Sequence, residues 1–320
     1  MTATPLVMRV PATKHTKPAV TPARSGQGSL LHGALAASVK AFDALGEWDR
    51  IDPLIKPMQS AVRALPLGRA RDVLHGLDVG HPLHPFLVQV PIGAWLSAAV
   101  LDAVPGSARQ SRALIGVGLL AAGPAGLAGW VDWAEQHEQQ MRTGLVHAAG
   151  NVVAVWLYAS SWVARGRGRT GRGRALAYAG LAVAGASGAL GGHLAYRQGA
   201  GANKAEPVPH LLEPGWQALC ALDGLPVGEP VRRQLGEVPL LVFRHADDRV
   251  DVLAERCSHQ SGPLSDGTVR DGCVECPWHG SVFRLADGEP VSGPATAPQP
   301  CFETRTGADG TLEVCLPGAG

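Results

Sequence analysis

The chain has 320 residues, of which 46% are apolar and only 17% charged. This apolar content excludes a wholly disordered protein, while an ordinary soluble protein carries about 25% charged residues. The net charge of +1 hides a division, because residues 1–204 contain 20 Lys and Arg against 10 Asp and Glu, and residues 205–320 contain 8 against 17. The sequence therefore predicts two chemically different parts and disfavours a nucleic-acid-binding protein.

The N-terminal part begins with a stretch of low complexity. Residues 1–28 contain no unbroken apolar run and no twin arginine, so we expect a disordered tail without a cleavable signal. In residues 29–74 apolar side chains recur at helical intervals, interrupted by Pro53 and Pro57. Two short amphipathic helices are predicted there, either on a membrane surface or packed on each other in water.

Four blocks without Asp, Glu, Lys or Arg follow, at residues 79–101, 113–131, 143–164 and 175–196. Each is long enough to cross a hydrocarbon core of about 30 Å, since a helix rises about 1.5 Å per residue. A buried soluble bundle would show a polar face on each helix, whereas these blocks are apolar all round. Residues 75–202 are therefore predicted to form a four-helix transmembrane bundle, a multi-pass domain of the cell membrane with the lipid bilayer as its partner.

The four blocks show a faint internal repeat. A shift of 63 residues places His84 on His147, Trp95 on Tyr158, Gly129 on Gly192 and Trp130 on His193. The first two spans are therefore expected to duplicate the last two.

Four spans would bring several histidines to one membrane face, because the starts of spans one and three lie on the same side as the ends of spans two and four. His84, His147 and His193 gather there, while His81 is expected to cap a helix. Two interpretations stay open. The rings can sit at headgroup depth, or they can form a second site for haem b, another metal or quinone.

The charge distribution bears on sidedness. Five arginines lie within residues 165–174, between spans three and four. The positive-inside rule places this connection in the cytoplasm and both chain ends outside, although the absence of an export signal argues for the opposite orientation. An RNA-binding patch is disfavoured here, because no aromatic residues are interleaved with the arginines.

The composition changes again near residue 207. After a linker at residues 203–213, short β-branched and leucine-rich runs separated by Gly, Asp and Pro predict a small antiparallel β domain over residues 214–317. All six cysteines lie in this acidic part. Such a distribution favours a local cysteine-histidine site over a disulfide framework.

Two Cys-His pairs stand within the β domain. Cys257-x-His259 is followed, after sixteen residues, by Cys276-x-x-His279. Pairs of this kind on two loops can hold one metal ion, or a two-iron cluster in which two thiolates bind one iron and two imidazoles the other. Spacing alone leaves both possibilities open.

The residues around these pairs carry a family resemblance. CSH on the first loop and CPWHGS on the second resemble the Rieske [2Fe-2S] family, over about residues 215–316. The resemblance implies a [2Fe-2S] cluster, with Cys257 and Cys276 on one iron and His259 and His279 on the other. A zinc ribbon is disfavoured, since zinc sites favour Cys-x-x-Cys knuckles. Cys273 is then expected to be a strand residue that leads into the second loop.

The resemblance also distinguishes subfamilies. Rieske proteins of the cytochrome bc complexes carry a second cysteine on each loop and join the loops by a disulfide, whereas the matching positions here are Gly262 and Trp278. Their serine is present as Ser281, but their tyrosine position is Phe283. Hydrogen bonds to the cluster region raise the potential, so these differences predict a low-potential, ferredoxin-like site.

The membrane half has a resemblance of its own. GHPLHPFLVQVPIGAW, GWVDW and GLVHAAGNVVAVWLY resemble a bacterial family of four-span membrane proteins of undefined function, over about residues 75–202. This resemblance supports the topology and implies no chemistry.

The combined prediction is a four-helix transmembrane bundle followed by a small all-β Rieske domain that carries one electron between unidentified redox proteins or quinone. Rieske oxygenases need a further domain with mononuclear iron, and the sequence ends at Gly320, so an oxygenase acting by itself is not expected. Two alternatives remain. One is a subunit that oxidises quinol or reduces haem through the histidine face, and the other is a redox-sensing module.

Overall fold

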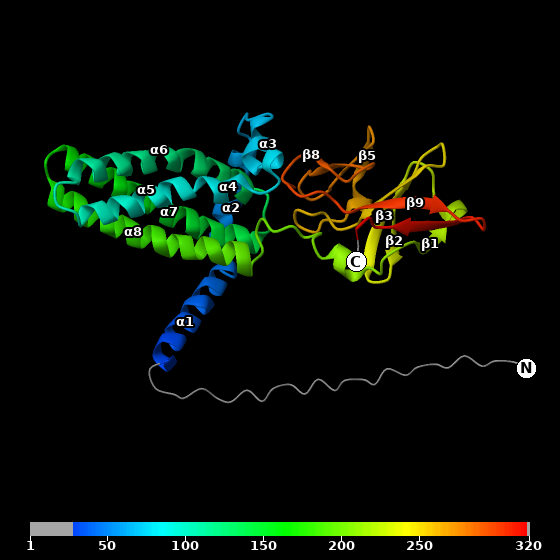
Figure 1. The fold of residues 1–320 in the computed structure, drawn as a ribbon, viewed down its shortest axis with the longest axis horizontal. Coiled ribbons are helices and arrows are strands. Elements are labelled where there is room, and N and C mark those ends of the chain that lie inside the picture. Colours follow the sequence, from blue (N-terminus) through cyan, green and yellow to red (C-terminus); the bar gives the residue numbers. More distant parts are fainter. Residues whose placement is uncertain (1–27, 319–320) are drawn as a thin grey trace, which may run out of the picture. The chain divides into compact units, whose positions relative to one another are not determined.

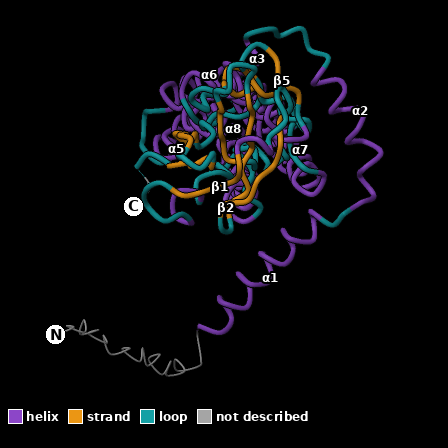
Figure 2. Tube along the Cα trace, turned by 90° about the vertical axis from the view of Figure 1, so that its right-hand side faces the viewer, coloured by secondary structure: helices purple, strands orange, loops and turns teal. Residues whose placement is uncertain are grey.

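The computed structural model describes residues 28–318, so nearly all of the predicted tail lies outside the described residues. The chain divides into two compact units, residues 1–41 and residues 42–320. The described residues of the first unit belong to helix α1 (Gly28–Gly46), which continues to Gly46 in the second. The colours of Figure 1 show that the helical elements precede the strands along the chain, and Figure 2 distinguishes the two kinds of element.

The segment predicted as amphipathic helices contains several short elements after α1. They are the 3-10 turn η1 (Asp49–Ile51), α2 (Asp52–Arg63), α3 (Ala70–His75) and the 3-10 turn η2 (Leu77–Val79). Pro53 lies in the first turn of α2, where the N–H that proline lacks would have no helical partner. Ile55 is buried together with Trp133 and Met141 of the following helices. The segment therefore packs on the bundle and not only on itself.

Four long helices form an up-and-down bundle in which they lie side by side (Figure 1). They are α5 (Gln89–Asp102), preceded by the one-turn α4 (Leu83–Leu87), α6 (Ala108–Trp133), α7 (Glu138–Gly166) and α8 (Thr170–Gly192), which continues as a π-helical turn, η3 (His193–Arg197). Trp95, Ile115 and Tyr158 form the buried core between them, with alanines at the close approaches.

In the part of the chain that the structure describes, three helical segments are long and apolar enough to cross a membrane: Leu83–Asp102, Ala108–Trp133 and Thr170–Arg197. The helix over the third predicted block, α7, is not among them. The charge-free block of residues 143–164 is only part of this helix, and α7 also contains Glu138, Arg142 and Arg165. The helical part and the all-β part are otherwise found in the predicted order.

The internal repeat has a structural counterpart where α5 meets α7. Trp95 and Tyr158, which are 63 positions apart, stack with their ring centroids 4.1 Å apart and their planes 13° from parallel. His84 and His147, also 63 apart, have ring centroids 6.3 Å apart. Equivalent residues of a duplicated hairpin face each other in this way across a pseudo-twofold axis.

Each of these histidines is fixed by the second helix of its own hairpin. Nδ1 of His84 donates to the carbonyl of Ala125, and Nδ1 of His147 to that of Ser187, both at 2.8 Å. Both rings lie against a glycine. A Cβ on Gly129 would lie 2.8 Å from the His84 ring, and a Cβ on Gly191 would lie 2.9 Å from the His147 ring. The second helices therefore correspond by 62 positions, and the predicted matches of Gly129 with Gly192 and Trp130 with His193 are wrong by one residue.

A third pair of residues that are 63 positions apart is charged. Arg165 donates through Nη1 and Nη2 to the two carboxylate oxygens of Asp102, at 2.7 and 2.5 Å. The two side chains are 2% and 0% exposed, and their positions again differ by 63. A buried ion pair of this kind contributes less to net stability than its Coulomb energy suggests, but the loss of one partner is strongly destabilising.

The C-terminal part contains ten strands in two antiparallel sheets. They are β1 (Gln217–Ala221), β2 (Pro230–Leu235), β3 (Val238–Arg244), β4 (Val250–Ala254), β5 (Thr268–Arg270), β6 (Cys273–Glu275), β7 (Val282–Arg284), β8 (Pro290–Ser292), β9 (Cys301–Thr306) and β10 (Thr311–Cys315). The larger sheet has the order β1-β10-β9-β4-β3-β2, and the smaller one β5-β6-β7-β8.

The larger sheet separates two apolar cores. Successive side chains of a strand point to opposite faces, so Leu240 and Val242 of β3 enter one core while Leu241 and Phe243 enter the other. The second core also holds both cysteines of the predicted motif. The alternation of apolar residues along the central strands thus forms the support for the motif loops.

Candidate metal centre

The fold brings the four predicted cluster ligands together. The first loop joins β4 to β5 and carries Cys257 and His259, and the second joins β6 to β7 and carries Cys276 and His279. The cysteines are 1% and 3% exposed and share one core. The two imidazole centroids lie 5.1 Å apart, with the rings nearly perpendicular.

Both loops use the same backbone turn. In each, the cysteine N–H donates to the carbonyl five residues later, and the cysteine carbonyl accepts from the N–H four residues later. The residue at that fourth place has positive φ, 62° at Ser261 and 69° at Gly280. This backbone region disfavours most side chains but suits glycine, so only the first loop, at Ser261, is locally strained.

The two thiols form an acid–base pair. A hydrogen bond from Cys257 lowers the pKa of Cys276 to about 7, against the effect of burial, and the N–H groups of Trp278 and His279 lower it further. The same hydrogen bond and burial raise the pKa of Cys257. One thiol of the pair is thus readily deprotonated, and thiolates are the form that binds iron.

The two imidazoles are neutral at pH 7. Burial lowers the pKa of His259 to about 3 and that of His279 to about 4, and the neighbouring His137 lowers both further. Nδ1 of His259 is buried and has no hydrogen-bond partner among residues 28–318. Such an atom is costly unless it binds something. Two thiols, two neutral imidazoles and this unpaired nitrogen fit a [2Fe-2S] cluster.

The positions that carry cysteines in the cytochrome bc proteins touch each other here. A Cβ on Gly262 would lie 2.7 Å from Sγ of Cys276 and 3.2 Å from the Trp278 ring. The Trp278 indole of the second loop therefore packs against Gly262 of the first loop, at the positions that the disulfide joins in those proteins. All six cysteines are free thiols, and Cys273 lies in β6, as predicted.

The predicted serine and phenylalanine are both inaccessible to solvent. Oγ of Ser281 accepts from the N–H of Ala295 at 3.1 Å, which leaves its own proton to donate. Phe283 packs in the core beneath the cysteines and offers no hydroxyl.

A turn between α6 and α7 lies against both motif loops. The His137 ring centroid is 5.9 Å from that of His279 and 5.6 Å from that of Trp278, and Nε2 of Gln260 donates to Oε1 of Gln136 at 2.7 Å. A cavity of about 380 Å³ is lined by His137, Pro277, Trp278 and His279. Sequence reasoning gave these contacts no role, because they join residues more than a hundred positions apart.

The predicted histidine face is only partly formed. His84 and His147 approach each other as described, but the ring of His193 packs 5.5 Å from that of Phe42, and its Nε2 lies 3.4 Å from Asp43. His193 is therefore not a third member of the site, because the rotation of its helix turns it towards α1. His81 caps no helix, since its exposed ring contacts the carbonyl of Pro82.

Comparison with known proteins agrees with the two-part architecture. Residues 215–303 match the Rieske [2Fe-2S] domain, and residues 80–204 match a predicted membrane protein family, DUF2231. The anthranilate 1,2-dioxygenase ferredoxin subunit of Burkholderia cepacia is 38% identical over 99 residues, which is 31% of this chain and 90% of that protein. Ferredoxin CarAc of Metapseudomonas resinovorans is 36% identical over 92 residues, 28% of this chain and 84% of that protein.

A solved structure is also similar to the C-terminal part of the chain. In the complex of reduced oxygenase and oxidized ferredoxin of carbazole 1,9a-dioxygenase, one chain is 32% identical, with a TM-score of 0.29, and the match covers 31% of this chain and 92% of that chain. The homology to ferredoxin subunits implies one-electron transfer at a [2Fe-2S] cluster. Through its C-terminal domain the chain belongs to the Rieske [2Fe-2S] family, joined in one polypeptide to a predicted membrane protein domain.

Proposed function

We propose that the chain is a membrane-anchored Rieske electron carrier, in which Cys257 and Cys276 hold one iron and His259 and His279 the other. The observation that carries this assignment is the buried, unpaired Nδ1 of His259 beside two thiols presented by matching turns. When bound, the cluster supplies reversible storage of one electron. The chain's own residues hold it, keep water from its sulfurs and expose one histidine edge.

The anchor would be all four helices, including α7. Thr143 and Ser161 of α7 are fully buried, whereas its exposed side chains include Val152, Val153 and Trp156 at 50% or more. A helix with a buried polar face and an exposed apolar face suits a lipid environment. This arrangement supports a spanning α7 despite its modest mean hydropathy.

Electron exchange would take place at the His279 edge. His279 and Trp278 line the cavity shared with His137, so an incoming redox protein or small carrier there would approach the cluster through the ring of a ligand. The relative from Burkholderia cepacia is by name the ferredoxin subunit of a dioxygenase, and we propose a redox protein as the partner here too. Its identity and the membrane side on which it binds are left to experiment.

The test is cofactor analysis of the full chain, purified anaerobically in detergent from carbonate-washed membranes. Two iron and two acid-labile sulfide per chain are expected, with the electron paramagnetic resonance of a reduced Rieske centre. Cys257→Ser should abolish the signal, whereas Cys273→Ser, which removes a strand cysteine three residues from Cys276, should retain it. Zinc without sulfide in the wild-type protein would refute the assignment.

A second candidate function concerns His84 and His147. Because Nδ1 of each donates to a carbonyl, each Nε2 carries a lone pair. That of His147 accepts a hydrogen bond from Nδ2 of Asn151 at 3.0 Å, which a metal ion would have to displace. Two imidazoles bound to one metal at about 2 Å each would have centroids about 6 Å apart, close to the 6.3 Å observed. Two axial histidines are sufficient for a haem iron. Pyridine haemochrome and metal analysis of the same preparation tests this candidate, and the absence of both haem and metal would overturn it.

A further inference from the structure

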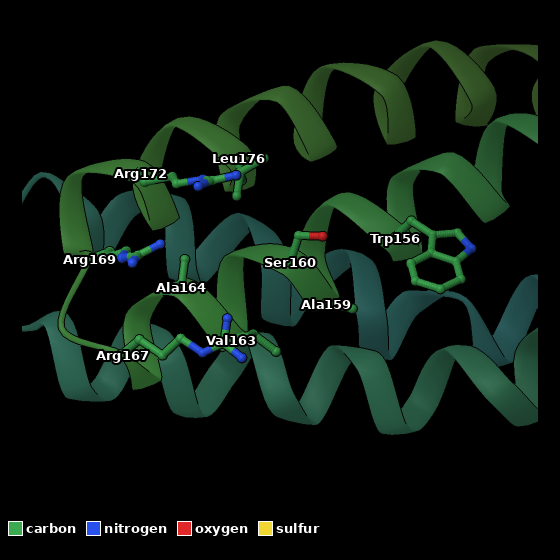
Figure 3. A pocket seen from close by; sticks show the side chains of 9 residues that line it. All are labelled: Trp156, Ala159, Ser160, Val163, Ala164, Arg167, Arg169, Arg172 and Leu176. Carbon is green, nitrogen blue, oxygen red and sulfur yellow. The ribbon is translucent and has the colours of Figure 1, made fainter.

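The loop end of the α7–α8 hairpin carries a groove of about 300 Å³ that takes no part in the cluster site. It is lined by Trp156, Ala159, Ser160, Val163, Ala164, Arg167, Arg169, Arg172 and Leu176 (Figure 3). In Figure 3 the side chains of Arg167, Arg169 and Arg172 all extend from the loop end towards the side on which Trp156 lies. The groove is thus apolar along its length and cationic at one end.

The apolar part is a stripe on one face of α7. Residues at intervals of four, three and four lie on one face of a helix, and this face carries Trp156, Ser160, Val163 and Arg167. Trp156 is 70% exposed and Val163 40%. The eleven helical steps from Trp156 to Arg167 span about 16 Å, which is close to half of a hydrocarbon core of about 30 Å.

The arginines at this end of the bundle fall into two groups. Arg165 pairs with Asp102, and Arg112 lies over the Trp162 ring, 4.2 Å from its centroid. The groove's own arginines (Arg167, Arg169 and Arg172) are different, because within residues 28–318 their guanidinium groups have no ion-pair or hydrogen-bond partner. Three unpaired cations above an apolar groove are complementary to a molecule with an anionic head and an apolar tail.

We infer that this groove binds an anionic phospholipid, with its phosphate against Arg167, Arg169 and Arg172 and an acyl chain along Val163 towards Trp156. Guanidinium groups bind phosphate oxygens through paired N–H donors, and the length of the stripe matches one leaflet. The inference rests on the proposed membrane anchoring. It adds a lipid selectivity that anchoring alone does not require.

The test is native mass spectrometry of the delipidated full chain in detergent, titrated separately with phosphatidylglycerol and phosphatidylcholine. A detergent micelle has no inside and outside. Lipid retention by a variant that would insert into a membrane in the opposite orientation can therefore still be compared with that of the wild type. The wild type should retain phosphatidylglycerol preferentially. Arg169→Gln should lower the preference about fivefold, as expected for one basic residue near an anionic headgroup, and the triple variant Arg167→Gln/Arg169→Gln/Arg172→Gln should abolish it.

The matched control is Arg109→Gln, which removes the same charge from the α5–α6 end of the bundle at an exposed site outside the groove. Its preference should equal that of the wild type, and excess inorganic phosphate should not displace the lipid. Equal retention of both lipids, an equal loss in Arg109→Gln, or a dimer in place of a lipid adduct would overturn the inference. A wild-type chain released from membranes by carbonate would instead overturn the anchoring itself.

Discussion

Replacing Gly262 by alanine tests how closely the two cluster loops are packed. The added methyl group would lie 2.7 Å from Sγ of Cys276, whereas ordinary contact begins at 3.4 Å, so the sulfur or its loop must retreat by more than half an ångström. The Trp278 ring, 3.2 Å from the same point, is half exposed and can turn aside. The sulfur is buried and cannot do so as easily.

The expected magnitude follows from these contacts. Inserting a methyl group into a packed core costs about 1–3 kcal/mol, and metal–ligand distances tolerate changes of only about 0.2 Å. The φ angle of Gly262 is not in the left-handed region, so alanine causes no backbone strain and the effect is steric. Gly262→Ala should therefore fold but bind its cluster weakly, with iron and sulfide well below two of each per chain.

The assay is iron and sulfide content together with visible circular dichroism of the purified full chain. Gly224→Ala is the matched control, because a Cβ at that position meets nothing within 4 Å and the site lies in the same domain. The control should carry a complete cluster. A complete and spectroscopically unchanged cluster in Gly262→Ala would refute the packing argument and show that the loops separate more easily than their contacts indicate.

Three further predictions concern the ion pair, the potential and the topology. Asp102→Asn should lower the free energy of unfolding by about 3–5 kcal/mol, because Arg165 would be left buried and unpaired. Asp102→Leu combined with Arg165→Met should recover most of this loss, and thermal unfolding in detergent, followed by tryptophan fluorescence, measures both. Voltammetry of the full chain should give a potential in the lower part of the Rieske range of about −150 to +300 mV, and Phe283→Tyr should raise it; a wild-type value near the top contradicts the reasoning from missing hydrogen bonds. Reporters inserted at residues 104–106 and 167–169 should give the same signal and one after Gly320 the opposite, whereas a chain in which α7 does not span would separate the first two.

The cluster site could be predicted from the sequence because its information is local. Each loop carries a cysteine and a histidine within four positions, and the strands on either side bring the loops together. The partners of the bundle could not be predicted in the same way. Span order correctly placed His193 at one end of its helix, but the direction of its ring depends on helix rotation, which turns it towards Phe42. The packing of His137 against His279 likewise depends on tertiary structure.

The repeat shows the same limit at the scale of one residue. A shift of 63 residues relates α5 to α7, where equivalent residues touch. His84, however, hydrogen-bonds to the carbonyl of the residue 41 positions later in the chain, and His147 to that of the residue only 40 positions later. The second hairpin is therefore one residue shorter between equivalent points. A comparison that allows no gap loses the register there, whereas the hydrogen bonds recover it.

The pairing of Asp102 with Arg165 bears on the evolutionary history of the bundle. If α5–α6 and α7–α8 descend from one hairpin that assembled with a copy of itself, position 102 once faced an identical residue across the twofold axis. Two buried like charges would have repelled each other, so this complementary pair could arise only after fusion allowed the two copies to differ. The acid on one hairpin and the base on the other now make each half a poor partner for its own duplicate. Such a pair fixes a single arrangement of the two halves within one chain.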